Sequence, residues 1–291
     1  MSDLRERVPG HALIEELLRQ WDLGTIRIDE QTDQVVIDEE AEGWYRGVIG
    51  ERRVGTILTA LGEGWTVLHS VPVGRGTSDI DHIVIGPSGA FTINTKFSPG
   101  KNVWVAGHGM YVGGTKQPYV RNALHEANRA STCLSRSCGL TVPVTALIVF
   151  VDPARITQKA TPGGGEYDAP VQVLRDTEVL TALRGRPEFS TEQVARIAEA
   201  AIRPETWSLR GLSASTGTHI AREFLALEAA VGPRLSMPRL QASAGTTQQT
   251  VRAKAQRASR RTRRSRTDRV TTQLVLPIVA LFGLWAWFSS R

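Results

Sequence analysis

Residues 79–96 read DIDHIVIGPSGAFTINTK, a pattern that predicts a central element of the fold. Two runs rich in Ile, Val, Phe and Thr flank Gly86-Pro87-Ser88-Gly89, which has the composition of a tight turn. We therefore predict a β-hairpin with a four-residue loop, in which Ile85 pairs with Ala90. The fold then has to bury a hairpin that is apolar for most of its length.

Four polar side chains interrupt the apolar character of this hairpin. The predicted pairing places Asp81 opposite Asn94 and Asp79 opposite Lys96. Residues two apart in a strand share a face, so all four side chains gather on one side, with opposed Cβ atoms about 4.5–5.5 Å apart. A bulge of one residue would break the cluster.

Such a cluster has two interpretations. An aspartate is a hard oxygen ligand for magnesium, and a neighbouring lysine stabilises developing negative charge. The alternative is a solvent-facing set of cross-strand ion pairs, such as Asp79 with Lys96. Spacing alone does not choose between them.

Periodicity along the rest of the chain predicts an α/β fold, with a mixed sheet flanked by helices over about residues 40–185. Helices are predicted over about residues 11–20, 39–61, 120–134, 179–183, 190–202 and 218–231. Strands are predicted over 65–73, 80–85, 90–97, 101–111, 142–151 and 171–174, with a short hairpin at 25–37. We divide the chain into an N-terminal extension (1–38), a core domain (39–185), a helical extension (186–231), a flexible basic linker (232–270) and a C-terminal apolar segment (271–290).

Gly50-Glu51 in the predicted helix, the stretch 79–89 and Ile93-Asn94-Thr95-Lys96 resemble the nuclease-related domain (NERD) family. That family resembles the restriction-endonuclease-like superfamily, whose signature is PD-(D/E)xK. The resemblance covers about residues 43–155. It implies that Asp81 is the signature aspartate, that Asn94 occupies the (D/E) position and that Lys96 is the signature lysine, with Glu51 as the helix acid.

The resemblance also implies a cofactor and a substrate. Catalytic residues would be Glu51, Asp81, Asn94 and Lys96. A Mg²⁺ or Mn²⁺ ion would be held by Asp81, Asn94, Glu51 and the backbone carbonyl of Thr95. The implied reaction is hydrolysis of phosphodiesters in nucleic acid, with DNA as the first candidate.

Two features of the residues themselves bear on this implication. Glu51 lies three residues before Val54 and seven before Leu58, in line with an apolar stripe, where an ionised carboxylate is costly unless it meets a cation or water; the alternative is an acid at the exposed helix edge. Asn94 departs from the signature because an amide brings no negative charge. Either a weaker metal site still cleaves, or catalysis is lost and the protein is a binding scaffold.

Several neighbouring residues are candidates of lower rank. His82 points to the opposite strand face from Asp81, which favours a packed histidine over a general base. Asp79 is a candidate accessory acid. Polar residues at 116–122, Asn128 and Arg129, and Arg75 in a loop, are positioned to contact phosphates, although a solvated helix start explains the same pattern.

The C-terminal region differs in composition from the rest. Residues 252–291 carry a net charge of +9 and the remaining chain −3, so the basic balance does not mark the body as nucleic-acid-binding. Residues 271–290 contain no charge over 20 residues, which predicts a single transmembrane helix. The basic run before it then places the body at the cytoplasmic face of the cell membrane. The alternatives are a buried core helix, and a basic run that itself binds nucleic acid.

The remaining sequence argues against a secretory signal and against a zinc site. The N-terminus lacks the apolar run of a secretory signal. Cys133 and Cys138 do not have the spacing of zinc ligands, and we expect two reduced thiols. The abundance of Arg, Ala and Gly is typical of a GC-rich bacterial genome. Oligomeric state is not indicated by the sequence.

Overall fold

The structure is a computed structural model, which describes residues 3–29, 34–73, 78–106, 109–159, 171–207 and 216–231. These residues belong to one unit, residues 1–238. The predicted linker and transmembrane segment (232–290) lie outside the described residues, as does Arg75. Within the described ranges, no helix is both long enough and apolar enough to cross a membrane.

A mixed five-stranded sheet with the strand order β11-β9-β5-β4-β3 forms the centre of the fold. The strands β3, β4 and β5 are antiparallel neighbours, whereas β5, β9 and β11 run parallel. The strand bounds are β3 (Thr66–Pro72), β4 (Asp79–Gly86), β5 (Gly89–Phe97), β9 (Val144–Val151) and β11 (Val171–Arg175). The predicted hairpin is β4–β5, and its predicted register is confirmed by the pairs from Ile85–Ala90 to His82–Ile93.

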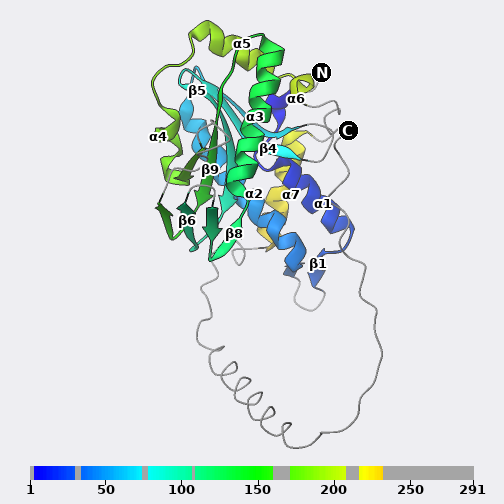
Figure 1. Cartoon of the computed structure of the whole chain (residues 1–291). Helices are drawn as coiled ribbons and strands as arrows, with labels where there is room; N and C mark the ends of the chain where they lie inside the picture. Colours follow the sequence, from blue (N-terminus) through cyan, green and yellow to red (C-terminus); the bar gives the residue numbers. More distant parts are fainter. Residues whose placement is uncertain are drawn as a thin grey trace, which may run out of the picture. The chain divides into compact units, whose positions relative to one another are not determined.

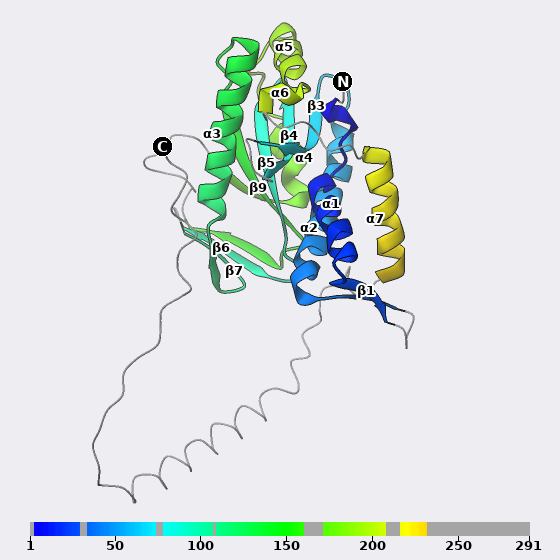
Figure 2. The same cartoon turned by 90° about the vertical axis from the view of Figure 1, so that its right-hand side faces the viewer.

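Two long helices cover opposite faces of this sheet (Figures 1 and 2). Helix α2 (Glu39–Leu58) buries Val54 and Leu58 against Phe91 and Ile93 of β5. Helix α3 (Tyr119–Cys138) buries its apolar stripe in the larger core on the other face. The α/β class with a sheet flanked by helices is therefore confirmed. Neighbouring residues of β5 alternate between these two faces. Each polar side chain of β5 therefore lies either on the face covered by α2 or on the face covered by α3.

A second sheet, with the order β10-β6-β7-β8, lies beside the first. Its strands are β6 (Asn102–Ala106), β7 (Gly109–Val112), β8 (Thr115–Gln117) and β10 (Arg155–Gln158). The prediction of one strand over 101–111 was wrong, since Val103 pairs with Val112 and Val105 with Met110 in an antiparallel hairpin. Both arms alternate apolar and polar residues with the same period, so the pattern did not reveal the reversal. Strand β10 was not predicted.

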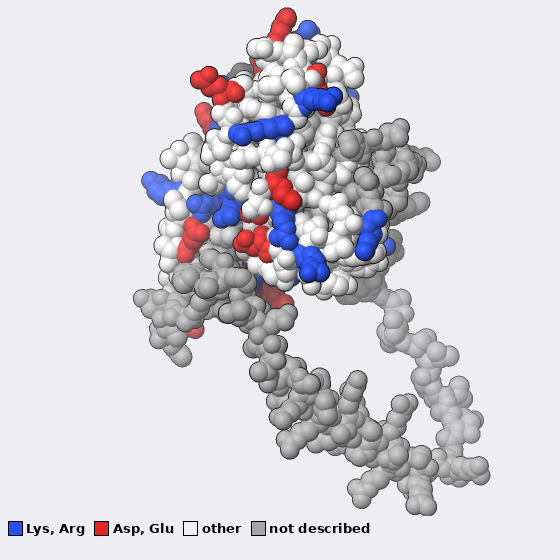
Figure 3. All heavy atoms as spheres, turned by 90° about the vertical axis from the view of Figure 1, so that its left-hand side faces the viewer, with Lys and Arg blue, Asp and Glu red and all other residues white. Residues whose placement is uncertain are grey.

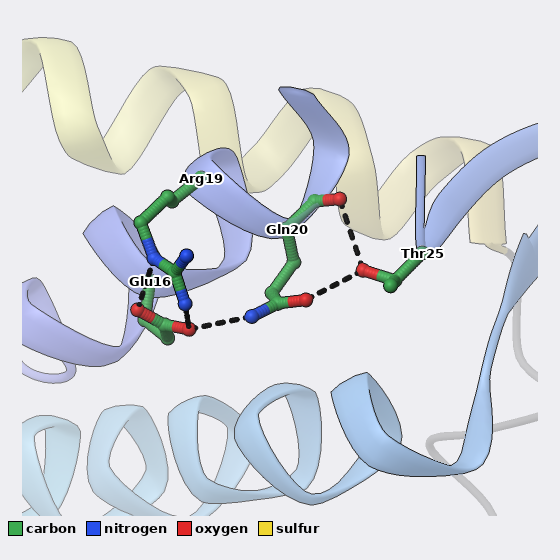
Figure 4. Close-up of polar contacts among 4 residues, drawn as sticks. All are labelled: Glu16, Arg19, Gln20 and Thr25. Carbon is green, nitrogen blue, oxygen red and sulfur yellow. Dashed lines mark hydrogen bonds and ion pairs between the residues drawn. The ribbon is translucent and has the colours of Figure 1, made fainter. Parts of the chain in front are cut away.

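The N-terminal elements form a third apolar cluster with the first half of α2 and a C-terminal helix. They are α1 (His11–Asp22), β1 (Ile26–Asp29), β2 (Gln34–Ile37) and α7 (Gly217–Val231). Polar contacts fix the end of α1 against the start of β1 (Figure 4). Gln20 Nε2 donates to Glu16 at 2.7 Å, and Thr25 Oγ1 lies 2.6 Å from Gln20 Oε1. Glu16 also pairs with Arg19.

The helices after β11 are α4 (Val179–Leu183), α5 (Thr191–Ala201) and α6 (Pro204–Trp207). The predicted start of α5 is confirmed, because Ser190 Oγ accepts from the N–H of Gln193 and the Gln193 side chain accepts from the N–H of Ser190. Helix α6, which the sequence did not predict, is held by an indole N–H of Trp207 that donates to the carbonyl of Ala201 at 2.7 Å.

Candidate functional site

The carboxylate of Asp81 lies where the β4–β5 ladder ends. Backbone pairing stops at His82–Ile93, one residue before Asp81 and Asn94 would pair. The N–H of Thr95 instead donates to Oδ2 of Asp81 at 2.6 Å. The two strands therefore separate at the predicted cluster, and a side-chain oxygen takes the place of a backbone acceptor.

The amide of Asn94 contacts a carboxylate that the sequence interpretation did not include. Its Nδ2 donates to both carboxylate oxygens of Glu126, at 2.8 and 2.9 Å, and Glu126 comes from α3. The Oδ1 atom of Asn94 is buried and has no hydrogen-bond partner. The amide thus ties Glu126 to the strand and leaves its own oxygen available.

Glu51 reaches the site from α2. The side chain is 5% exposed, which confirms that it lies in the buried face of the helix. The backbone N–H of Gly10, just before α1, donates to Glu51 Oε2 at 3.1 Å. Helix α2 approaches β5 closely beside Glu51, since a Cβ atom on Gly50 would lie 3.3 Å from Thr95 Cγ2 and 3.1 Å from Phe97 Cβ.

Lys96 lies on the same face of β5 as Asn94. Its Nζ is 4.9 Å from the centroid of the Tyr119 ring, at the start of α3. Asp79 and Lys96 are both described, and no ion pair joins them, so the interpretation as an Asp79–Lys96 cross-strand pair was wrong. The reason is the early end of the ladder, which removes these two residues from direct opposition.

Asp79 and Thr95 complete the set of predicted residues. Oδ2 of Asp79 and Oγ1 of Thr95 are buried and have no hydrogen-bond partner. The buried guanidinium of Arg7 donates from Nε to the carbonyl of Ser70 at 2.7 Å, and its charge lowers the pKa of Asp79. The N-terminal segment thus packs against two acids of the site, Asp79 and Glu51.

The acids of the site repel one another. Burial, followed by repulsion from Asp81, raises the pKa of Asp79 to about 7, and the same two causes raise the pKa of Glu126 to about 7. Burial, and then Asp81 and Asp79, raise the pKa of Glu51 well above its usual range. Burial also raises the pKa of Asp81, against the opposing effects of Lys96 and the Thr95 N–H. Repulsion from Asp81 thus contributes to the raised pKa of each of the other three acids.

A cavity of about 470 Å³ opens beside these acids. Asp79 and Glu126 line it together with two arginines of α3, Arg121 and Arg129. Asn128, Arg129 and the helix start at 116–122 were candidates for phosphate contacts, with a solvated helix start as the alternative. Of these residues, Arg121, Asn122, Asn128 and Arg129 line the cavity. The cavity thus brings cationic groups next to the acid cluster.

His82 lies on the other face of the sheet, as predicted. It is fully buried, and its Nδ1 lies 2.9 Å from Nδ1 of His69 on the neighbouring strand. Burial lowers the pKa of His69 to about 4 and that of His82 well below its usual range. The two rings form a packed pair in which burial disfavours the protonated form.

Comparison with known protein families gives one match. Residues 46–151 match the nuclease-related domain (NERD). This domain spans the whole acid cluster, from Glu51 in α2 through β4 and β5 to Glu126 in α3. The expected likeness to the restriction-endonuclease-like superfamily is consistent with this match. No match was found among curated proteins or among solved structures.

The donor atoms of the nuclease-related domain can be compared with the needs of a divalent cation. Within the described ranges, no group of three or more His, Cys, Asp or Glu side chains is arranged to hold a metal ion. Mg²⁺, however, is usually bound by one or two carboxylates together with waters or other oxygens. The carboxylate of Asp81 and Oδ1 of Asn94, which has no hydrogen-bond partner, are oxygen donors of the kind that such a site uses.

Glu126 is the residue that the sequence interpretation missed. It lies three residues after Ala123 and four before Ala130, both buried, so it borders the apolar stripe of α3. Helix periodicity places Glu126 beside buried residues, as it does Glu51 in α2, but periodicity alone does not distinguish a site residue from an acid at the helix edge. The resemblance to the nuclease-related domain includes no motif at that position.

Proposed function

We propose that the chain is a nuclease that hydrolyses phosphodiesters in nucleic acid with a divalent cation, DNA being the first substrate to test. The observation that carries this proposal is the convergence of Glu51, Asp79, Asp81 and Glu126 at the end of the β4–β5 ladder, beside Lys96. Excess buried negative charge of this kind is stabilised by a bound cation. The match to a nuclease-related domain supports the same reaction class.

In this proposal each residue has a distinct role. Asp81 and the oxygen of Asn94, with the Thr95 carbonyl, hold the cation, and Glu51 holds the cation or a water. When bound, the cation polarises the scissile phosphate and lowers the pKa of a water. Lys96 stabilises the negative charge that develops on the phosphate oxygens during attack.

The cavity is the proposed position of the nucleic-acid backbone. Arg121 and Arg129 line it and can donate to phosphate oxygens. The face drawn in Figure 3 carries acidic and basic side chains interspersed rather than one extended basic surface. Because no extended basic surface is visible on that face, the proposal relies on Arg121 and Arg129 for phosphate contacts.

The test is cleavage of labelled single-stranded, duplex and branched DNA by the full-length chain, with Mn²⁺, Mg²⁺ or EDTA. We expect metal-dependent cleavage that Asp81→Asn abolishes and that Lys96→Met lowers about 10²–10³-fold. Both variants should keep the circular dichroism spectrum of the parent. Cleavage that persists in EDTA or in Asp81→Asn would refute the proposal.

A second function rests on Asn94, whose amide lacks the charge of the signature acid. In this alternative the chain is a binding scaffold on a nuclease fold without catalysis. Tight DNA binding without cleavage by folded protein, unchanged in Asp81→Asn, would favour the scaffold. A gain in cleavage on Asn94→Asp would favour the enzyme.

We also propose that residues 271–290 anchor the body at the cytoplasmic face of the cell membrane, with the basic run at 251–270 against anionic headgroups. The support is sequence alone: 20 uncharged residues follow nine Lys and Arg. Sedimentation with membranes after alkaline carbonate washing tests the anchor. Release by that wash would contradict it.

A further inference from the structure

Asn94 stands on β5 where the signature has an acid, and it contacts an acid of α3, Glu126. Asn94 on β5 donates through one nitrogen to both oxygens of Glu126 on α3, at 2.8 and 2.9 Å. A neutral amide can hold a carboxylate in this way without neutralising its charge. The negative charge absent at position 94 is therefore present one hydrogen bond away.

The environment of Glu126 differs from that of its neighbours on α3. Arg121, Asn122 and His125 are exposed, whereas Glu126 is partly buried and faces the sheet. Among the ion pairs found in the described residues, none includes Glu126. Lys96 attracts this carboxylate, but Asp81 and Asp79 repel it, and the amide of Asn94 brings no charge. A cation bound beside Glu126 would therefore be stabilised.

Two buried oxygen atoms of the site, on Asn94 and Asp79, have no hydrogen-bond partner. Oδ1 of Asn94 is buried without a partner, because its Nδ2 is the atom turned to Glu126. Oδ2 of Asp79 is also buried without a partner. Glu126 and Asp79 both line the cavity, so the side chain bonded to Asn94 borders a space that is open to solvent.

We propose that Glu126 is the second carboxylate ligand of the divalent cation and replaces the acid that is absent at position 94. Asn94 has two tasks: its nitrogen orients Glu126, and its oxygen faces the ion. The cation site then combines Asp81 of β4, Asn94 of β5 and Glu126 of α3, while Glu51 of α2 keeps the role given to it above. This inference rests on the proposed function, of which it names a further ligand.

Mn²⁺ binding without nucleic acid tests the inference separately from cleavage. Affinity is measured by calorimetric titration of the full-length chain in detergent at pH 8. Glu126→Gln keeps the size and an oxygen that can accept from Asn94, but removes the charge. We expect it to weaken Mn²⁺ binding at least about tenfold, because cation affinity depends on the number of ligand charges.

A double variant that places a carboxylate at position 94 and removes the one at position 126 provides the decisive comparison of Mn²⁺ affinity. The double variant Asn94→Asp with Glu126→Gln should bind Mn²⁺ within about threefold of the parent, since one carboxylate is again present beside Asp81. A purely structural role for Glu126 predicts no such rescue. Glu199→Gln, an exposed acid on α5, is the matched control and should leave affinity unchanged.

The outcomes separate this inference from the proposed function. If Asp81→Asn weakens Mn²⁺ binding while Glu126→Gln does not, Glu126 is no ligand and the inference fails, although the proposed function stands. If Glu126→Gln binds weakly and the double variant is not rescued, the replacement of position 94 is refuted. If the folded parent binds no Mn²⁺, both fail.

Discussion

The backbone N–H of Thr95 donates to Oδ2 of Asp81 at 2.6 Å, at the level where β4 and β5 stop pairing. One carboxylate thereby serves two purposes: it closes the sheet hydrogen-bonding pattern and points a charged group at the acid cluster. The two purposes can be separated by substitution, because an amide oxygen can accept the same hydrogen bond.

Asp81→Asn should abolish metal-dependent cleavage at little cost in stability, whereas Asp81→Ala should lose cleavage and also stability. Alanine leaves the Thr95 N–H without an acceptor, which costs about 1–3 kcal/mol. Thermal unfolding in EDTA measures the difference between the two variants. Equal stability of the two would show that the Thr95 hydrogen bond contributes nothing to the fold.

The β4–β5 hairpin illustrates how much of the fold local sequence predicts. The turn chemistry of Gly86–Gly89 and the alternation on each side gave the correct register through His82–Ile93. The splitting of the ladder beyond that pair depends on a side chain that replaces a backbone acceptor. No period-2 pattern contains that information, so Lys96 was placed opposite Asp79 although the two are not paired.

The acid cluster shows a second limit of sequence interpretation. Asp81 and Asn94 are close in sequence and follow from strand register, and Glu51 follows from helix periodicity together with the family resemblance. Glu126 lies 32 residues from Asn94, on another helix. Its role depends on how α3 packs on β5, which a single sequence does not determine.

Close packing of α2 on β5 should be necessary for the site. In Gly50→Val the new side chain would collide with Thr95 and Phe97, and we expect a loss of about 1–3 kcal/mol in stability. Because Glu51 is the next residue, cleavage should fall as well. Gly43→Val, on the same helix with no atom near its Cβ position, carries the same helix propensity change and is the control. If both variants behave alike, packing at Gly50 does not matter.

Without metal, the acids should make the protein less stable as pH rises. The pKa of Asp79 is about 7 in the folded protein and 3.8 as the usual value. The unfolded chain therefore releases this proton first, and the free energy of unfolding decreases between about pH 4 and 7. At about 1.4 kcal/mol per pKa unit, the decrease attributable to Asp79 is at most about 4 kcal/mol.

Asp79→Asn isolates this effect. Measured in EDTA, the stability of the variant relative to the parent should increase as pH rises from 4 to 7, and then level off. Glu199→Gln should show no such trend. Addition of Mn²⁺ at pH 8 should restore much of the lost stability in the parent. A flat difference across the whole pH range would contradict the assignment.

The buried histidine pair should make the protein less stable as pH falls, which is opposite to the effect of the acids. Burial lowers the pKa of His69 to about 4, below its usual value of 6.5. As pH falls below about 6.5, the unfolded chain takes up protons that the folded protein excludes, so stability is lost between about pH 6.5 and 4. His82→Asn keeps a polar atom near Nδ1 and should reduce this acid sensitivity. His125→Asn, at an exposed position, should not; an equal change in both would rule out the pair as the cause.

Nucleic-acid binding should depend on the two arginines that line the cavity. Arg121→Ala with Arg129→Ala should weaken DNA binding in low salt and lower the slope of log affinity against log salt by about 1–2, since each phosphate contact releases about one counterion. The exposed Arg222 on α7 provides the control, and its alanine variant should bind as the parent does. Fluorescence anisotropy over a range of salt concentrations gives both the affinity and its salt dependence.

Deletion of residues 252–291 separates the contribution of the basic run from that of the body. If this deletion abolishes DNA binding while the arginine variants bind as the parent does, the basic run alone binds nucleic acid and the cavity does not.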